Sequence, residues 1–233
     1  MPVPAPHPDA RAVVTGASQG IGEALAFDLA ARGHHLIITA RRGEVLAELA
    51  GRITERHGVT VEVRALDLAD PAGEKAQVQL NAVAVHDLCL AVLPGMLARK
   101  AGGILISGSA AGNSPIPNNA TYAATKAFAN TFSESLRGEV KKDGVHVTLL
   151  APGPVRTELP DVSEQSLVER LIPDFLWIDT EYTAKVSLDA LEANKMRIVP
   201  GLTSKAMSVA SGYAPRAIVT PIVGAVYKKL GGE

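Results

Sequence analysis

Two side chains in the stretch ATYAATKAF have the types and spacing needed for proton transfer. Tyr122 and Lys126 lie four residues apart within a helical pattern, so they project from the same face of the expected helix. A free tyrosine ionises near pH ~10, and a neighbouring ammonium favours the phenolate and brings its pKa closer to neutrality. The same spacing is common on solvated helix faces, so the pair alone leaves both interpretations open.

A second candidate is the glycine-rich stretch TGASQGIG, which follows the apolar run AVV and opens a helical pattern. Gly16, Gly20 and Gly22 could form a plain tight turn. They could also let the backbone approach a pyrophosphate at the N-terminus of the helix. The order of strand, turn and helix favours a dinucleotide site.

Two arginines follow the next strand-like run. A site for an unphosphorylated ribose usually has an acidic residue about 20 positions beyond the glycines. This chain has Ala40 there, followed by Arg41 and Arg42. Because guanidinium groups suit a 2′-phosphate, the sequence predicts NADP as the cofactor, with NAD less favoured. The alternative is that the arginines only cap a solvated helix start.

These groups need a scaffold, and short apolar runs alternate with helical patterns along the chain. Strands are expected at 12–14, 35–39, 60–64, 104–107, 145–150 and 196–199, and helices at 20–32, 43–57, 74–100, 121–143 and 180–194. The continuous apolar runs predict strands that are covered on both faces. The alternation predicts an α/β fold, a doubly wound parallel sheet with helices on both faces and ligands at the carboxyl ends of the strands.

The bulk properties limit the function classes. The 233 residues carry a net charge of −1 and 47% hydrophobic residues, which predicts one globular domain over 1–233 and no nucleic-acid partner. The single cysteine, Cys89, is expected to pack in the interior. No metal site, signal peptide or membrane span is expected, and the predicted location is cytoplasmic.

TGASQGIG, Ser109, YAATK at 122–126 and PGPVRTE at 152–158 occur in one order. Together they resemble the classical short-chain dehydrogenase/reductase family over essentially the whole chain. The resemblance implies a Rossmann-like domain, a homodimer or homotetramer, and hydride transfer between NADP and a carbonyl or secondary alcohol. A catalytically silent NADP-binding scaffold or sensor is the alternative.

The resemblance also implies roles for individual residues. Tyr122 would be the acid/base, Lys126 would lower its pKa and bind the nicotinamide ribose, and Ser109 would orient the substrate oxygen. Asn81 would support a proton-relay water, while Ser107 would be structural. The residues expected to bind the cofactor are Gly16, Ser18, Gln19, Gly20, Ile21, Gly22, Arg41, Arg42, Asp67 (at the adenine), Leu68, Tyr122, Lys126, Pro152, Gly153, Val155 and Thr157.

The stretch at about 158–180 resembles the family's substrate-covering segment. Its apolar stripe predicts a mainly apolar substrate such as a lipid, steroid or fatty-acyl carbonyl. The alternative is that the stripe packs on the body of the protein. The stripe consists of Leu167, Val168, Leu171 and Ile172, and it is followed by Phe175, Leu176 and Trp177.

The chain departs from the family in one place. There, a strand bearing an Asn-Asn-Ala-Gly-like motif follows the position of Asp67 by about twenty residues, whereas here Asp67 and Asn81 are only fourteen apart with no strand-like run between them. A βαβ unit needs ~30 or more residues. We therefore expect that the sequence omits roughly thirty residues between Asp70 and Lys75. An overlong Cα–Cα step there would support the omission, and hydrogen bonding between the strands at 12–14 and 104–107 would contradict it.

Overall fold

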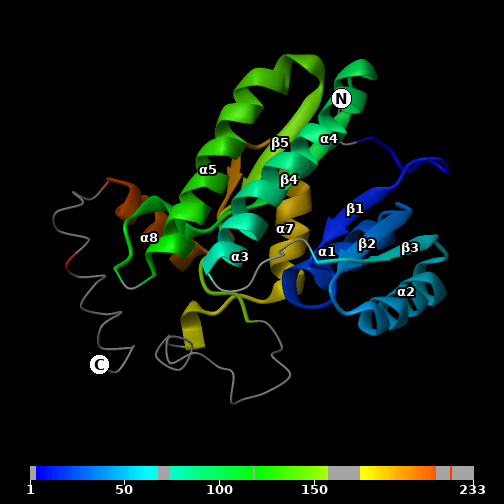
Figure 1. The fold of residues 1–233 in the computed structure, drawn as a ribbon, viewed down its shortest axis with the longest axis horizontal. Helices are drawn as coiled ribbons and strands as arrows, with labels where there is room; N and C mark the ends of the chain where they lie inside the picture. Colours follow the sequence, from blue (N-terminus) through cyan, green and yellow to red (C-terminus); the bar gives the residue numbers. More distant parts are fainter. Residues whose placement is uncertain (1–3, 68–73, 118, 157–173, 214–220, 222–233) are drawn as a thin grey trace.

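The computed structural model describes residues 4–67, 74–117, 119–156, 174–213 and 221. Its described residues form parallel strands and packed helices in alternation, which confirms the predicted Rossmann-like α/β class. The strands fall into two three-stranded sheets; in Figure 1 the first sheet lies at the right and the second lies nearer the centre.

The first sheet has the order β1-β2-β3 and all its pairs are parallel. It comprises β1 (Ala12–Thr15), β2 (Leu36–Ala40) and β3 (Val61–Ala65), with α1 (Gly20–Ala31) and α2 (Gly43–His57) as the connecting helices. Its core is built from side chains of β2 and α2 that are essentially inaccessible to water, namely Leu36, Ile38, Leu46, Leu49 and Ile53.

The second sheet has the order β4-β5-β6 and is also parallel. Its strands are β4 (Gly102–Ser107), β5 (Val145–Leu150) and β6 (Arg197–Ile198), accompanied by α5 (Ala120–Val140), α7 (Thr180–Glu192) and α8 (Leu202–Tyr213). All six residues of β5 are buried, which is what a nearly continuous apolar strand predicts.

The predicted elements are confirmed to within three residues at each end. Left-handed glycines, Gly58 and Gly144, terminate the segments before β3 and β5, as glycine after a helix commonly does. Cys89 is 4% exposed, so its predicted packing is confirmed. Helix α8 was not predicted, because its sequence carries small and polar residues without a clear apolar period.

One long helical run differs in detail from the single helix expected at 74–100. It consists of α3 (Glu74–Val78), a π-helical turn (Gln79–Val83) and α4 (Ala84–Ala98). By length and composition alone, Glu74–Ala98 is apolar enough to cross a membrane, and only 11% of its most apolar window is buried. Such composition is weak evidence for a span.

Two expectations about the strands fail or stay open. Coverage of both faces is confirmed for β5 but is wrong for β1, where Val13 is 52% exposed in the part of the chain that the structure describes. Among the described residues no strand lies between β3 and β4, and β1 and β4 belong to different sheets. The overlong step was expected between Asp70 and Lys75, and residues 70–73 of that window lie outside the described residues.

Candidate active site

The glycine-rich turn joins β1 to α1 with the geometry of a phosphate-binding turn. Gly16 and Gly20 have φ of 65° and 60°, in the left-handed region that favours glycine. A Cβ on Gly22 would collide with the carbonyl oxygen of Gly16, so only glycine allows the helix to start this close to the turn. The α1 N-terminus therefore presents free backbone N–H groups beside bare backbone, which suits an anion.

Arg41 and Arg42 follow β2 directly, and β2 pairs with β1 so that Thr39 lies beside Thr15. Both arginines are exposed, and the guanidinium of Arg42 reaches back over the turn. Its Nη2 donates to Gln19 Oε1 at 2.7 Å and to the Ser18 carbonyl at 3.2 Å. The structure therefore places one of the two positive charges directly against the glycine-rich turn.

Ser109 lies at the carboxyl end of β4 and caps a short 3₁₀ helix, Ala110–Asn113. Its Oγ accepts the N–H of Ala111 at 3.0 Å, which leaves the hydroxyl hydrogen free to donate. The residue is 9% exposed.

Tyr122 and Lys126 lie on α5 as predicted. Lys126 Nζ lies 5.8 Å from the centroid of the Tyr122 ring and donates to the carbonyl of Ser107 at 3.2 Å. Burial lowers the pKa of Lys126 from its usual value, because removing the ammonium from water disfavours its charged form. A positive charge beside the phenol is the arrangement that proton transfer by Tyr122 requires.

Asn81 occupies the π-helical turn, and π-turns are frequent at functional sites. Its Nδ2 donates to Thr125 Oγ1 at 3.3 Å, and Thr125 Oγ1 donates to the Tyr122 carbonyl at 2.9 Å. Asn81 is thus connected to the helix of Tyr122 and Lys126 through Thr125. Sequence reasoning missed Thr125, although its position three residues after Tyr122 was a usable signal.

The segment after β5 borders Ser109. The Pro152 carbonyl accepts the N–H of Ala110 at 3.1 Å, and Val155 forms a parallel bridge with Ile178. A Cβ on Gly153 would collide with the Ser204 hydroxyl, so glycine allows α8 to approach this segment. The predicted nicotinamide segment is therefore fixed beside the candidate catalytic serine.

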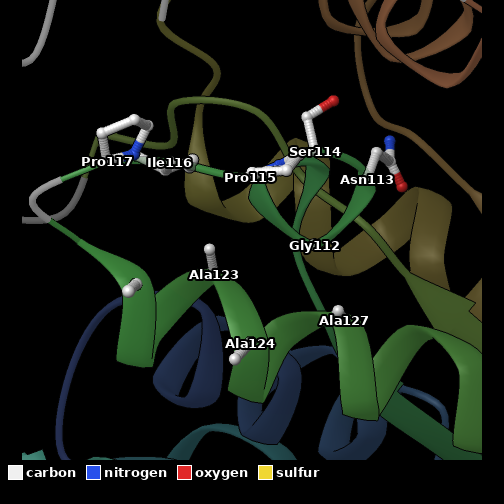
Figure 2. Close-up of a pocket in the computed structure, with 10 residues that line it drawn as sticks. Gly112, Asn113, Ser114, Pro115, Ile116, Pro117, Ala123, Ala124 and Ala127 are labelled. Carbon is white, nitrogen blue, oxygen red and sulfur yellow. The ribbon is translucent and has the colours of Figure 1, made fainter. Parts of the chain in front are cut away.

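A hollow of about 390 Å³ lies near these residues. Figure 2 shows the stretch 112–117 passing over the alanine face of α5, formed by Ala123, Ala124 and Ala127. Tyr122 and Lys126 are rotated from the centre of this face by roughly a third of a helical turn or more. The hollow is therefore distinct from the space in front of the Tyr–Lys pair.

The remaining predicted residues are distributed as follows. Asp67 is exposed just beyond β3, at the same end of the sheet as the glycine-rich turn. Leu68 and Thr157 lie outside the described residues, as do Leu167, Val168, Leu171 and Ile172. Of the substrate-covering segment, the described part includes Trp177, which is half-buried beneath the guanidinium of Arg156 at 5.8 Å. Among the described residues no group of three potential metal ligands occurs.

Comparisons with known proteins identify the family of this chain. The family model described as short chain dehydrogenase matches residues 10–79 and 73–167. A very-long-chain 3-oxoacyl-CoA reductase of Anas platyrhynchos is 33% identical over 66% of this chain and 62% of its own length. This chain thus spans less than two thirds of that relative.

A bacterial relative is covered more completely. An uncharacterised short-chain type dehydrogenase/reductase of Sinorhizobium fredii is 31% identical over 78% of this chain and 85% of its own length. Among solved structures, a short-chain dehydrogenase from Sphingobium yanoikuyae in complex with NADPH superposes with a TM-score of 0.76 and 25% identity, covering 90% of this chain and 94% of that one.

Proposed function

Because the chain belongs to the short-chain dehydrogenase family of oxidoreductases, we propose that it is an NADP-dependent enzyme that interconverts a carbonyl and a secondary alcohol. The observation that carries this proposal is the Lys126 ammonium beside the Tyr122 ring on a helix that also anchors Asn81. A protein that only binds nucleotide has no chemical need for this combination.

The nicotinamide supplies the hydride when NADP(H) is bound. In reduction, Tyr122 gives its phenolic proton to the carbonyl oxygen while the Ser109 hydroxyl donates to the same oxygen. Lys126 stabilises the resulting phenolate by its charge, and it would also hold the nicotinamide ribose. Asn81 orders the water that returns a proton to the site.

The residues that surround the nucleotide fit NADP(H). Free N–H groups at the start of α1 suit the pyrophosphate, and Arg42 above Ser18 and Gln19 suits a 2′-phosphate. The NADPH complex of the Sphingobium yanoikuyae relative agrees with this cofactor. Asp67, at the same end of the first sheet, is assigned to the adenine.

We assign a mainly apolar substrate, a fatty-acyl carbonyl being the first choice. Support comes from the apolar composition of 158–180 and from the names of the 3-oxoacyl-CoA reductases to which the chain is similar. We also propose a cytoplasmic location. A span over Glu74–Ala98 would carry Asn81, His86 and Asp87 into hydrocarbon, which is costly.

We also propose that the protein forms a homo-oligomer. Large apolar side chains are exposed along the π-turn, α4 and the adjoining part of α5, and a second copy of the chain would cover them. They are Leu80, Val83, Leu88, Leu90, Val92 and Phe128. Light scattering of the purified protein gives its mass directly, and a monomer at micromolar concentration would contradict this assignment.

One observation favours the alternative of a silent nucleotide-binding scaffold: among the described residues the two sheets are separate and β1 is an edge strand. Titration with NADPH followed by fluorescence, and then NADPH oxidation with a panel of 3-oxoacyl thioesters, steroid ketones and sugars, distinguishes the two functions. Turnover of apolar ketones supports the enzyme. Tight NADPH binding without turnover of any ketone supports the scaffold, and preferred turnover of sugars contradicts the apolar substrate.

A further inference from the structure

A buried amide lies directly behind the candidate catalytic serine. Asn130 is on α5, one turn beyond Lys126 and two turns beyond Tyr122, so it continues the same helix face inward. It is 6% exposed. A polar side chain at such a position normally has hydrogen-bond partners, and those of Asn130 identify what it holds.

Asn130 bonds to the backbone of Ser109 from both sides. Its Oδ1 accepts the Ser109 N–H at 3.3 Å, and its Nδ2 donates to the Ser109 carbonyl at 2.9 Å. An amide can do this because its end carries an acceptor and a donor side by side. The two bonds fix the peptide units on both sides of the Ser109 side chain, and hence the direction of its hydroxyl.

The chain around Asn130 leaves room for this amide and little else. A Cβ on Gly108 would collide with Asn130 Oδ1, and a Cβ on Gly112 would lie 2.6 Å from Nδ2. The two glycines bracket the Ser109 turn, so the loop lies against the amide without intervening side chains. Such close contact makes the position of Ser109 sensitive to small changes at residue 130.

The amide also has a polar support that reaches beyond the turn. Asn130 Nδ2 lies 3.4 Å from Asn113 Oδ1, which also accepts from Arg197 at 2.8 Å. Asn113 Nδ2 donates to Ser208 on α8 at 3.1 Å. Asn130 is therefore one member of a network that ties the Ser109 turn to β6 and α8.

We propose that Asn130 is a positioning residue, which orients the Ser109 hydroxyl toward the substrate oxygen by clamping the Ser109 backbone. The proposal rests on the proposed oxidoreductase function for its kinetic consequence, although the clamp itself is independent of turnover. Misplacing a catalytic group by ~1 Å can reduce the rate roughly 100-fold. Loss of the clamp therefore lowers kcat and leaves the binding of NADPH unchanged.

Two variants test the clamp. Asn130→Asp keeps the shape and the acceptor but removes the donor to the Ser109 carbonyl, and Asn130→Ala removes both bonds. We expect kcat to fall roughly 10- to 100-fold in each, with the KM for NADPH within twofold of the unmodified protein. Ser133→Ala is the matched control, because Ser133 is buried on the same helix and its hydroxyl has no partner among the described residues.

A double variant separates positioning from general damage. If Asn130 acts through Ser109, then Ser109→Ala combined with Asn130→Asp has the kcat of Ser109→Ala alone, because the clamp then has no hydroxyl to orient. If the loss of kcat in the double variant is instead the product of the losses in the two single variants, the proposal is overturned, because Asn130 then acts by a route other than Ser109. Normal kcat in Asn130→Ala would overturn it as well.

Amide hydrogen exchange gives a readout that needs no turnover. The peptide containing Ser109 and Ala111 exchanges faster in Asn130→Ala than in Ser133→Ala, while the peptide containing the glycine-rich turn exchanges equally in both. If this holds but the unmodified protein reduces no ketone, the oxidoreductase function fails and the clamp stands. If exchange near Ser109 is unchanged, the clamp fails whatever the activity.

Discussion

The two sheets of this molecule differ in how completely their strands are covered. In the second sheet β5 lies between β4 and β6 and all six of its residues are buried. In the first sheet β1 pairs with β2 alone among the described residues, and Val13 is 52% exposed. Among the described residues β1 and β4, the strands that precede the glycine-rich turn and Ser109, both lie at an edge of their sheet. They differ in burial: three of the six residues of β4 are buried, against one of the four residues of β1.

The difference concerns backbone groups as well as side chains. Ala12 donates its N–H toward β2, so by the alternation of a strand Val13 and Thr15 direct theirs to the opposite edge. An unpaired N–H costs ~1–3 kcal/mol when buried but little when water reaches it. Among the described residues no strand accepts from the N–H groups of Val13 and Thr15.

The match to the family model also divides near the segment from which a further strand beside β1 is expected. The family model matches in two pieces, 10–79 and 73–167, which meet where the strand with the Asn-Asn-Ala-Gly-like motif is missing. An omitted stretch between Asp70 and Lys75 therefore remains our expectation. Such a stretch would pair with β1 and remove the contrast between the sheets.

The largest expected effect is on amide exchange. The amides of β5 should exchange only through global opening, which for a stability of ~5 kcal/mol means roughly 1000-fold protection or more. The amides of Val13 and Thr15 should exchange almost as in a peptide, because no strand that the structure describes pairs with their edge. Native-state exchange read by NMR measures both sets in one experiment. Equal protection of β1 and β5 would show that β1 is covered in solution.

The second prediction separates the proposed chemistry, which depends on Ser109, Tyr122 and Lys126 beside the second sheet, from NADPH binding at the glycine-rich turn of the first sheet. Tyr122→Phe removes the proton donor of the second sheet's site, and general acid–base catalysis contributes ~10²–10⁴-fold. We expect kcat to fall by that factor while NADPH affinity, set mainly by the first sheet, stays unchanged. Lys126→Ala should damage both, because Lys126 also holds the ribose. Ordinary turnover by Tyr122→Phe would exclude the proposed chemistry.

The third effect concerns the first sheet alone. Arg42→Asp places a carboxylate where a guanidinium now bonds to Gln19 and Ser18, so it should repel a 2′-phosphate. We expect preference to move from NADPH toward NADH by at least ~1.5–3 kcal/mol, a typical hydrogen bond to a charged group. Arg41→Asp should act in the same direction. If the unmodified protein already prefers NADH, both arginines are misassigned.

The sequence predicted most of the fold because its signals are local. Apolar runs such as 145–150 and terminating glycines such as Gly58 are properties of short windows, and these elements agree with the structure. The Tyr122–Lys126 face and the glycine-rich turn were predictable for the same reason. Asn130 was not identified, because its role depends on a turn twenty residues earlier that only tertiary packing brings to it. The open edge of β1 likewise depends on which strands become neighbours.

The smallest expected effect concerns the ion pairs between α1, which packs on the first sheet, and α7, which packs on the second. Arg32, at the end of α1, bonds to Asp189 and Glu192 of α7 as well as to Asp28 on its own helix. Burial alone would lower the pKa of Arg32, but these bonds outweigh it and raise the pKa. The hydrogen bond from Lys185 and, against the effect of burial, the bond from Arg32 hold the pKa of Asp189 below its usual value.

A carboxyl whose pKa is lower in the folded than in the unfolded state stabilises the fold above the unfolded pKa. That contribution is lost as the pH falls through the unfolded pKa and then the folded one. We therefore expect the Tm of the unmodified protein to fall on acidification below about pH 4. The Tm of Arg32→Ala should already be a few degrees lower at pH 7, and it should fall less steeply on acidification. Arg52→Ala is the matched control, because Arg52 pairs with Glu23 beside the first sheet. An exposed pair of this kind contributes ~0–1 kcal/mol. The Tm of Arg52→Ala should therefore fall with acidification as steeply as the Tm of the unmodified protein. Equal slopes for Arg32→Ala and Arg52→Ala would mean that the α1–α7 ion pairs do not hold the two sheets together.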